Sequence, residues 1–516
     1  MFRKFIISLV LLGSGICAGA QGVYDALRFS QQYAEGTARS VAMGNAFVAL
    51  GGDMGGLSVN PASSAVYRYS ELVFTPSITN SSSVTDYLGH SREGSKTKAG
   101  IANIGFVASY NTGRENAGLV NWSVGIVFNK QNNFTSAKDV YGMTNKTSWL
   151  SSVAYNTDGI YAPEMDINGG NNPYFTSNAP WNSILAWNSS LLDTLPGTND
   201  AFIGATENLY GNEISVGGDL DQYFSSRTVG NVNEAIINWG GNFANKLFVG
   251  FNLGIQSIYY KYEEGYSERA ANNSNDFQTG FESFSTNYRY SATGAGINLK
   301  AGLIYLPTNW LRFGASISTP TYMYLSEEWE NSMESKFNDG YSQRLSSPLG
   351  TYGYNLESPF RWNVGVAATV GTLGVISADY ESVNYSKALL SDAETFYGYA
   401  DENNDIQNML GQQNIFRIGA EVNVNPHFAV RAGYQFYSSP YKDATADDNL
   451  NIGSLGLGYN TSCGSSCNFF MDLTLQKQLK ARVEEFALYG DTNIAAPVGV
   501  TKSNNWKLLL SLGLRF

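Results

Sequence analysis

The chain has 516 residues, with 44 acidic and 32 basic side chains, and its formal net charge is −12 at pH 7. Nucleic acid is therefore not an expected partner, because phosphate backbones are bound by clustered Lys and Arg. The 54 Gly, 33 Tyr and 28 Phe are typical of strands and turns.

The first twenty residues have the organisation of a secretory signal peptide. Arg3 and Lys4 precede the apolar run 5–12, and Ala18-Gly19-Ala20 provides a cleavage site. This run is too short to cross a membrane as a helix, and no later apolar run approaches the roughly 20 residues that a membrane helix needs. Insertion into a membrane would therefore require a closed β-barrel, because hydrocarbon leaves unpaired backbone groups unsatisfied.

Residues 21–70 read as a compact insert made largely of Ala, Val, Ser and Gly, and we expect them to fold as a plug, or hatch, inside the barrel. A few large side chains interrupt this composition and are candidates for ligand binding: Tyr24, Leu27, Phe29, Met43 and Phe47. The alternative is that these side chains only pack the plug against the wall. Both interpretations stay open.

Residues 71–516 contain fourteen stretches in which apolar and polar residues alternate with the period of a strand. Phe416, Ile418 and Val422, for example, oppose Arg417 and Gly419. This pattern predicts an all-β, 14-stranded antiparallel transmembrane barrel, with an apolar face toward lipid and a polar face toward the lumen. The expected strands cover 71–81, 99–110, 118–130, 231–240, 246–262, 285–306, 310–324, 358–370, 374–386, 413–424, 428–438, 450–461, 468–480 and 505–516.

The connections between these stretches alternate between short and long, as in outer-membrane barrels with short periplasmic turns and long outer loops. The longest, about 131–230, is predicted to form a large extracellular loop with secondary structure of its own. One short turn contains Cys463 and Cys467, which we expect to form a local disulfide in an oxidising compartment. Geometry decides whether so short a loop can close.

The chain ends on a strand in which Leu508, Leu510, Leu512 and Leu514 share one face and the terminal residue is Phe516. Together with the signal peptide, this ending predicts a multi-pass β-barrel in the outer membrane of a Gram-negative bacterium. We expect outer-membrane lipid to surround the barrel, and the barrel-assembly machinery to recognise the strand that ends at Phe516.

The segment before the first strand resembles the FadL/TodX family of outer-membrane transporters for hydrophobic compounds. The similarity lies in Gly44-Asn45-Ala46, the acidic glycine stretch 49–57, and above all Asn60-Pro61-Ala62. The resemblance implies that Asn60, Pro61 and Ala62 belong to a gating hatch, and that a hydrophobic small molecule passes into a pocket near the N-terminal segment and leaves sideways through the wall. This chain departs from the fatty-acid members in its larger loops and its many Asn and Tyr residues.

Catalytic signatures are lacking in the sequence, which contains no G-x-S-x-G, H-E-x-x-H or P-loop pattern. Its two histidines, His90 and His427, are expected on opposite sides of the membrane. We therefore expect no enzyme, no cofactor and no metal site. Passive uptake of a fatty-acid-like or aromatic compound is the leading function; the alternative is a barrel of the same shape that docks secreted or surface proteins through its 131–230 loop.

Overall fold

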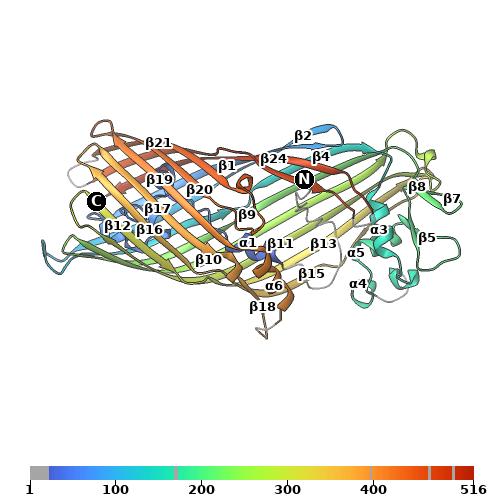
Figure 1. Cartoon of the computed structure of the whole chain (residues 1–516), viewed down its shortest axis with the longest axis horizontal. Coiled ribbons are helices and arrows are strands. Elements are labelled where there is room, and N and C mark those ends of the chain that lie inside the picture. Colours follow the sequence, from blue (N-terminus) through green and yellow to red (C-terminus); the bar gives the residue numbers. More distant parts are fainter. Residues whose placement is uncertain (1–21, 168–171, 396–397, 463–466, 491–493) are drawn as a thin grey trace.

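The computed structural model describes residues 22–167, 172–395, 398–462, 467–490 and 494–516. Fourteen antiparallel strands form a closed barrel, which the pairing of the first strand with the last completes. Around the barrel the neighbours are β1, β2, β3, β9, β10, β11, β12, β16, β17, β19, β20, β21, β22 and β24 (Figure 1). The predicted fold class is confirmed.

The barrel strands have the bounds β1 Glu71–Tyr87, β2 His90–Asn111, β3 Leu119–Asn133, β9 Leu220–Phe243, β10 Leu247–Ala270, β11 Phe281–Tyr305, β12 Leu311–Ser318, β16 Arg361–Val370, β17 Gly374–Asn384, β19 Gln412–Asn423, β20 Phe428–Tyr437, β21 Leu450–Ser462, β22 Asn468–Gln478 and β24 Val498–Arg515. Further strands are β4 Ser136–Thr144, β5 Leu192–Thr194, β6 Phe202–Gly204, β7 Glu207–Tyr210, β8 Glu213–Val216, β13 Tyr322–Phe337, β14 Ser342–Ser346, β15 Gly350–Glu357, β18 Leu389–Asp392 and β23 Arg482–Ala487.

The helices are short. They are α1 Val23–Ser30, α2 Ala38–Ala42, α3 Trp149–Thr157, α4 Pro173–Thr176, α5 Trp181–Asn188 and α6 Ala400–Met409, with 3-10 turns η1 Gly55–Ser58, η2 Pro61–Val66, η3 Ala162–Met165, η5 Ser274–Asp276, η6 Tyr385–Lys387 and η7 Ala446–Asp448. Within the described ranges, no helix is long and apolar enough to cross a membrane.

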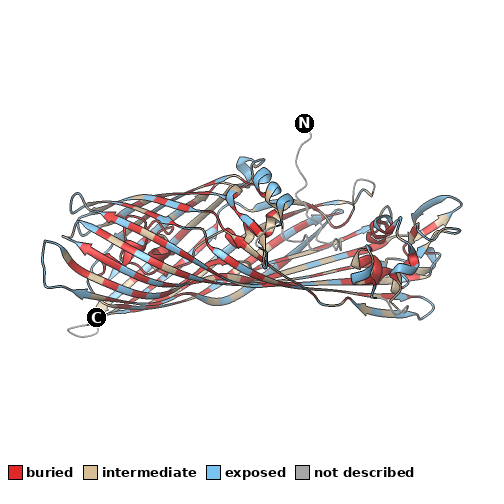
Figure 2. Ribbon diagram, turned by 90° about the horizontal axis from the view of Figure 1, so that it is seen from below, coloured by how far each residue is buried: buried red, intermediate tan, exposed pale blue. Residues whose placement is uncertain are grey.

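Alternation along the strands separates an outward apolar face from an inward polar face. Phe416 and Ile418 are 51% and 45% exposed, whereas Arg417 between them is 7% exposed. Figure 2 shows the same alternation of exposed and buried residues along the barrel. The outward side chains have the apolar character that lipid requires, and this architecture fits an outer-membrane barrel.

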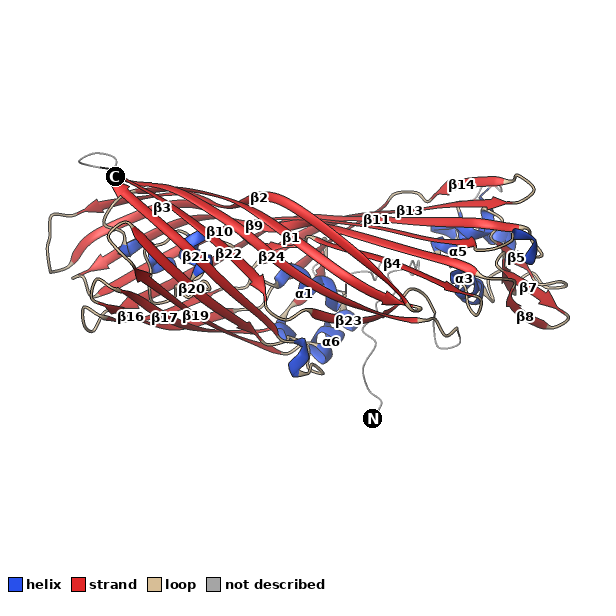
Figure 3. Ribbon diagram, turned by 90° about the horizontal axis from the view of Figure 1, so that it is seen from above, coloured by secondary structure: helices blue, strands red, loops and turns tan. Residues whose placement is uncertain are grey.

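The strands differ greatly in length, and this asymmetry shapes the molecule. β9, β10 and β11 have 24, 24 and 25 residues, whereas β17, β20 and β22 have 11, 10 and 11. The long strands continue as a curved extension on one side only, while the short ones stop near α6 (Figure 3). About 9–11 residues suffice to cross a bilayer, so the extension projects well beyond it.

The long connections predicted from sequence are therefore only partly loops, and this expectation was wrong. Residues 263–270 and 281–284 continue β10 and β11, and 325–357 forms most of β13 together with β14 and β15. The expected strand 310–324 is interrupted at 319–321, between β12 and β13. A second interruption at 358–360 separates β15 from β16, so the expected strand 358–370 begins only at Arg361. Pro320 and Pro359 stand at these two interruptions. Proline lacks the backbone N–H that a ladder needs, which explains both interruptions.

The predicted loop 131–230 is shorter than expected, because 131–133 end β3, β4 pairs with β9, and 220–230 begin β9. Between β4 and β9, residues 145–167 and 172–219 form a structured cap at the far end of the extension, with the helices α3, α4 and α5 and two small hairpins, β5–β6 and β7–β8. Its apolar side chains, among them Trp149, Leu150, Ile184 and Leu185, are buried against Phe284 and other strand residues. The cap helices lie at the end of the extension in Figure 1.

Two expectations fall wholly or partly outside the described residues. The signal peptide, 1–20, lies outside them, and so does Cys463. Cys467 is disulfide-bonded, and its pairing with Cys463 stays a prediction.

Topology is testable with protease sites inserted into described turns. A site inserted between Gly197 and Thr198, in the exposed cap, should be cut when protease is added to intact cells, because this end is predicted to face outward. A site inserted between Thr372 and Leu373 should be cut only after the outer membrane is permeabilised. Immunoblotting of the fragments shows which site was cut. Cleavage at 372–373 but not at 197–198 in intact cells would show that the orientation is the opposite of the predicted one.

Candidate functional site

The N-terminal segment, residues 22–70, makes its contacts with inward-facing side chains of the wall. It contains α1, α2, η1 and η2, and most of its residues up to Tyr67 are buried. Such a short-helix segment leaves many backbone carbonyls without partners inside the segment. The wall provides donors for them.

Asparagine side chains of the wall donate to these carbonyls. The Nδ2 atoms of Asn129, Asn238 and Asn252 lie 3.2, 3.0 and 2.8 Å from the carbonyl oxygens of Met54, Pro61 and Leu57. Asn121 Nδ2 donates likewise to Tyr67 at 3.0 Å. A primary amide suits this position because it can donate to a carbonyl and accept from a neighbour. The unusual Asn content of the chain thus has a structural use that sequence analysis missed.

Asn60, Pro61 and Ala62 lie where the N-terminal segment meets β9, β10 and β11. Asn60 caps η2 by accepting from the Ala62 N–H at 3.0 Å, and its Nδ2 donates to the carbonyls of Val48 at 2.6 Å and Leu303 at 3.1 Å. The wall approaches closely here because Gly302 has no side chain: a Cβ there would lie 1.9 Å from Asn60 Oδ1. The motif therefore joins the segment to the wall.

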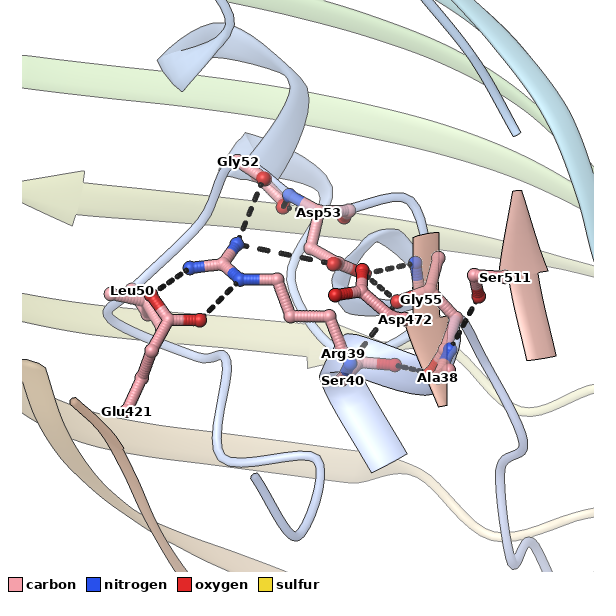
Figure 4. A network of polar contacts seen from close by, with 12 residues as sticks. Ala38, Arg39, Ser40, Leu50, Gly52, Asp53, Gly55, Glu421, Asp472 and Ser511 are labelled. Carbon is pink, nitrogen blue, oxygen red and sulfur yellow. Dashed lines mark hydrogen bonds and ion pairs between the residues drawn. The ribbon is translucent and has the colours of Figure 1, made fainter. Parts of the chain in front are cut away.

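Charged side chains make a second set of attachments. Arg39 of α2 reaches Glu421 at 2.8 Å and Asp53 at 4.0 Å (Figure 4). Arg431 also pairs with Glu421, at 2.6 Å. The Ala38 N–H donates to Ser511 Oγ at 2.7 Å. These buried charges all have partners, so they brace the segment against the wall.

One stretch of the wall lacks a strand-to-strand ladder, and the N-terminal segment fills it. β2 pairs with β3 only from Asn103 to Asn111, although β2 begins at His90. Within residues 71–167 as described, β4 makes no ladder with β2. It lies against the inner faces of β1 and β2, where Ser83 Oγ donates to the Ala137 carbonyl at 2.7 Å and a Cβ at Gly94 would lie 3.1 Å from the Asp139 nitrogen. We call this stretch, in which β2 and β3 are not joined by backbone hydrogen bonds, the wall gap.

Residues 31–35 run along the free edge of β3 at this gap. The N–H groups of Tyr33 and Glu35 donate to the carbonyls of Gln131 and Lys130, both at 2.8 Å. The Glu35 carboxylate, 2% exposed, pairs with Lys130 at 3.2 Å and Lys507 at 2.7 Å. The segment thus satisfies backbone groups that β2 leaves unpaired.

The five predicted ligand residues fall into two groups. Leu27 and Phe29 of α1 lie in an apolar cluster with strand residues of the extension, and Phe29 contacts Tyr260 edge-on at 6.0 Å between ring centroids. Tyr24 is half-buried. Met43 and Phe47 pack elsewhere, against Ala367 and Val375. Only the α1 group lies where aromatic side chains of several strands converge.

A groove lies on the outer face of the wall beside this cluster. Its volume is about 710 Å³, and it is lined by Ile297, Tyr322, Tyr324 and Leu389 among others. Met323 and Leu356 line it too, and both belong to the cluster around α1. A single layer of strands, at the level of the two proline interruptions, therefore separates groove and cluster.

Comparison with known proteins identifies the fold of this chain from its structure and not from its sequence. No protein-family model matches the sequence, and no match was found among curated proteins. A FadL homologue of Pseudomonas aeruginosa has a similar structure, with a TM-score of 0.54, 10% identity, and coverage of 94% of this chain and 99% of that one. This likeness shows that the chain has the FadL-type barrel fold.

Two toluene transporters were also found. TbuX of Ralstonia pickettii has a TM-score of 0.48 and 14% identity, covering 93% of this chain and 99% of its own. TodX of Pseudomonas putida has a TM-score of 0.48 and 12% identity, covering 94% and 99%. These values are too low to carry any argument beyond the match itself.

The attachment of the N-terminal segment predicts a stability effect at Asn60. Asn60→Ala removes a cap and the amide that donates to the carbonyls of Val48 and Leu303, so unfolding should become easier by about 2–4 kcal/mol. Urea unfolding of the full chain in detergent, followed by heat-dependent gel mobility, measures this. Asn80→Ala is the control, because the Asn80 amide donates to Thr97 in an exposed position; equal effects of both substitutions would contradict the proposed attachment.

Proposed function

We propose that this protein is an outer-membrane channel for passive uptake of a hydrophobic small molecule. The observation that carries the proposal is the combination of the wall gap with residues 31–35, which join the α1 cluster to the rest of the N-terminal segment. The FadL-type fold supports it at the level of architecture. The aromatic side chains around α1 suit an aromatic compound, the class to which the toluene carried by TbuX and TodX belongs, and we propose such a compound as the ligand of this chain.

In this proposal the N-terminal segment acts as a hatch. Its carbonyls and charges are bound to the wall at Asn129, Asn238, Asn252 and Glu421, so straight passage through the lumen would break many buried bonds at once. Residues 31–35 make only part of these attachments: two backbone hydrogen bonds to β3, one from the Asn132 amide to the Gln31 carbonyl, and the ion pairs of Glu35 with Lys130 and Lys507. A route that displaces only this stretch costs far less free energy than removal of the whole segment.

The ligand is proposed to bind at α1 and to leave through the wall gap. Binding beside Leu27 and Phe29 would shift α1 and draw residues 31–35 away from the edge of β3. The β2–β3 ladder below the gap spans nine residues of β2, Asn103–Asn111, close to the length that crosses a bilayer. The gap would therefore open at the outer boundary of the membrane, where an apolar solute enters lipid without returning to water.

The docking alternative receives less support. A protein-binding loop should present a contiguous apolar surface, whereas the cap buries its largest apolar cluster against the ends of the barrel strands. Uptake is therefore the function that the geometry supports best.

Binding at α1 predicts different consequences for the two phenylalanines. Phe29→Ala should weaken binding of N-phenyl-1-naphthylamine about tenfold, because Phe29 packs among Tyr260 and Phe134 at the proposed site. Phe47→Ala should lower stability while leaving affinity nearly unchanged, because Phe47 lies in the other cluster. Fluorescence titration of both variants in detergent measures the two affinities. An equal loss of affinity in both variants would contradict a ligand site at α1.

Exit through the wall gap predicts a block by a large side chain. Gly100 of β2 is half-buried, and a Cβ there would meet only Lys130 Nζ, at 3.2 Å. Gly100→Trp should reduce uptake of N-phenyl-1-naphthylamine into proteoliposomes several-fold, because the indole would occupy the gap. Ala99→Trp, on the exposed face of the same strand, is the matched control. Unchanged uptake in a folded Gly100→Trp protein would exclude this exit.

A further inference from the structure

The inner wall of the extension carries aromatic side chains from four neighbouring strands, next to α1. They pack against the cluster that contains Leu27 and Phe29, and several of them are only partly buried although they face inward. The register places Tyr262 of β10 opposite Tyr290 of β11, and Tyr290 opposite Trp329 of β13. This surface suits a flat or aromatic ligand. Its members are Tyr260, Tyr262, Tyr288, Tyr290, Trp329, Tyr352 and Tyr354.

Two buried acceptors without a donor lie in one cross-strand row of this wall. Glu264 is opposite Tyr288, and Tyr288 is opposite Asn331. Glu264 is 6% exposed; one of its oxygens accepts from the Tyr262 hydroxyl, while Oε1 has no hydrogen-bond partner. Asn331 is 5% exposed; its Nδ2 donates to Asn182 at 2.9 Å, and its Oδ1 has no partner.

Unpaired acceptors of this kind cost free energy unless something donates to them. They lie on either side of an aromatic ring and face the interior, so a ligand on that ring could reach one or both. The unmet requirement is for hydrogen-bond donors. A saturated hydrocarbon has none.

The charges around the row oppose an anionic ligand. Glu327 accepts from the hydroxyls of Tyr290 and Tyr354, at 2.5 and 2.7 Å. Two cations of the described residues lie beside this wall and have acidic partners: Arg28, which lies over the Tyr260 ring, pairs with Asp25, and Lys138 pairs with Glu484 at 3.6 Å. A carboxylate brought to this wall would meet Glu264 and Glu327, and neither Arg28 nor Lys138 is unpaired to compensate.

We propose that Glu264 and Asn331 form the polar end of the ligand site, and that the site selects aromatic compounds with a hydrogen-bond donor, a hydroxyl or an amine, over carboxylates. The ring lies on Tyr288 and its neighbours, and the donor binds Glu264 Oε1 or Asn331 Oδ1. This inference rests on the proposed function, because the wall is reached only if small molecules enter the lumen.

Three probes that share a ring and a tail test the selectivity: 4-hexylphenol, hexylbenzene and 4-hexylbenzoate. Each displaces N-phenyl-1-naphthylamine from the purified full chain in detergent, and fluorescence gives its affinity. We expect 4-hexylphenol to bind about tenfold more tightly than 4-hexylbenzoate and several-fold more tightly than hexylbenzene. A benzoate that binds as well as the phenol overturns the inference.

Variants locate the selectivity. Glu264→Met and Asn331→Leu should each bring the ratio of phenol to hexylbenzene affinity close to one while hexylbenzene still binds, which also shows that the variant is folded. Glu263→Met is the matched control, because Glu263 is the adjacent residue on the opposite face, with a side chain 46% exposed. If one variant fails to fold, the other variant provides the test. A folded variant in which the ratio of phenol to hexylbenzene affinity is unchanged contradicts the assignment.

The results also separate this inference from the proposed function. Equal binding of all three probes leaves an unselective hydrophobic channel: the proposed function stands and the inference fails. Absence of binding by any probe to the unsubstituted protein contradicts both.

Discussion

The requirement that buried backbone carbonyls be hydrogen-bonded governs the interior of this barrel. The N-terminal segment is too irregular to satisfy its own backbone, and the wall compensates with inward amides such as Asn129, Asn238 and Asn252. Glycine in the wall, as at Gly302, lets the two come into contact. Because each carbonyl has its own donor, the register of the strands and the path of the segment determine one another.

The same requirement explains the wall gap. β2 separates from β3 above Asn103, and β3 would be left with an unpaired edge if residues 31–35 did not bind there. Residues 31–35 are held there by backbone hydrogen bonds, by the Asn132 amide and by the buried ion pairs of Glu35. Displacing this stretch alone breaks fewer bonds than displacing the whole N-terminal segment, and the proposed transport route depends on that difference.

The extension gives the protein a lumen far longer than a bilayer requires. Proline interruptions near Pro320 and Pro359 mark the level at which the wall changes character, from alternating apolar and polar residues to an inner surface of tyrosines. Hydroxyls and carboxylates on that surface give it hydrogen-bonding capacity that a purely hydrocarbon-lined channel lacks. The tyrosine content of the chain is therefore connected to the lumen as well as to the lipid boundary.

Alternation along the chain predicts the barrel, because the strand period must place apolar residues toward lipid on every crossing, as at Phe416 and Ile418. The short turns and the position of Asn60, Pro61 and Ala62 just before the first strand can also be read from the sequence. Three facts come from the fold alone: Leu27 and Phe29 lie apart from Met43 and Phe47, predicted loops continue as strands, and Glu264 and Asn331 share a row. Those facts depend on register between strands distant in sequence, and alternation within one strand carries no information about which residue of another strand lies opposite.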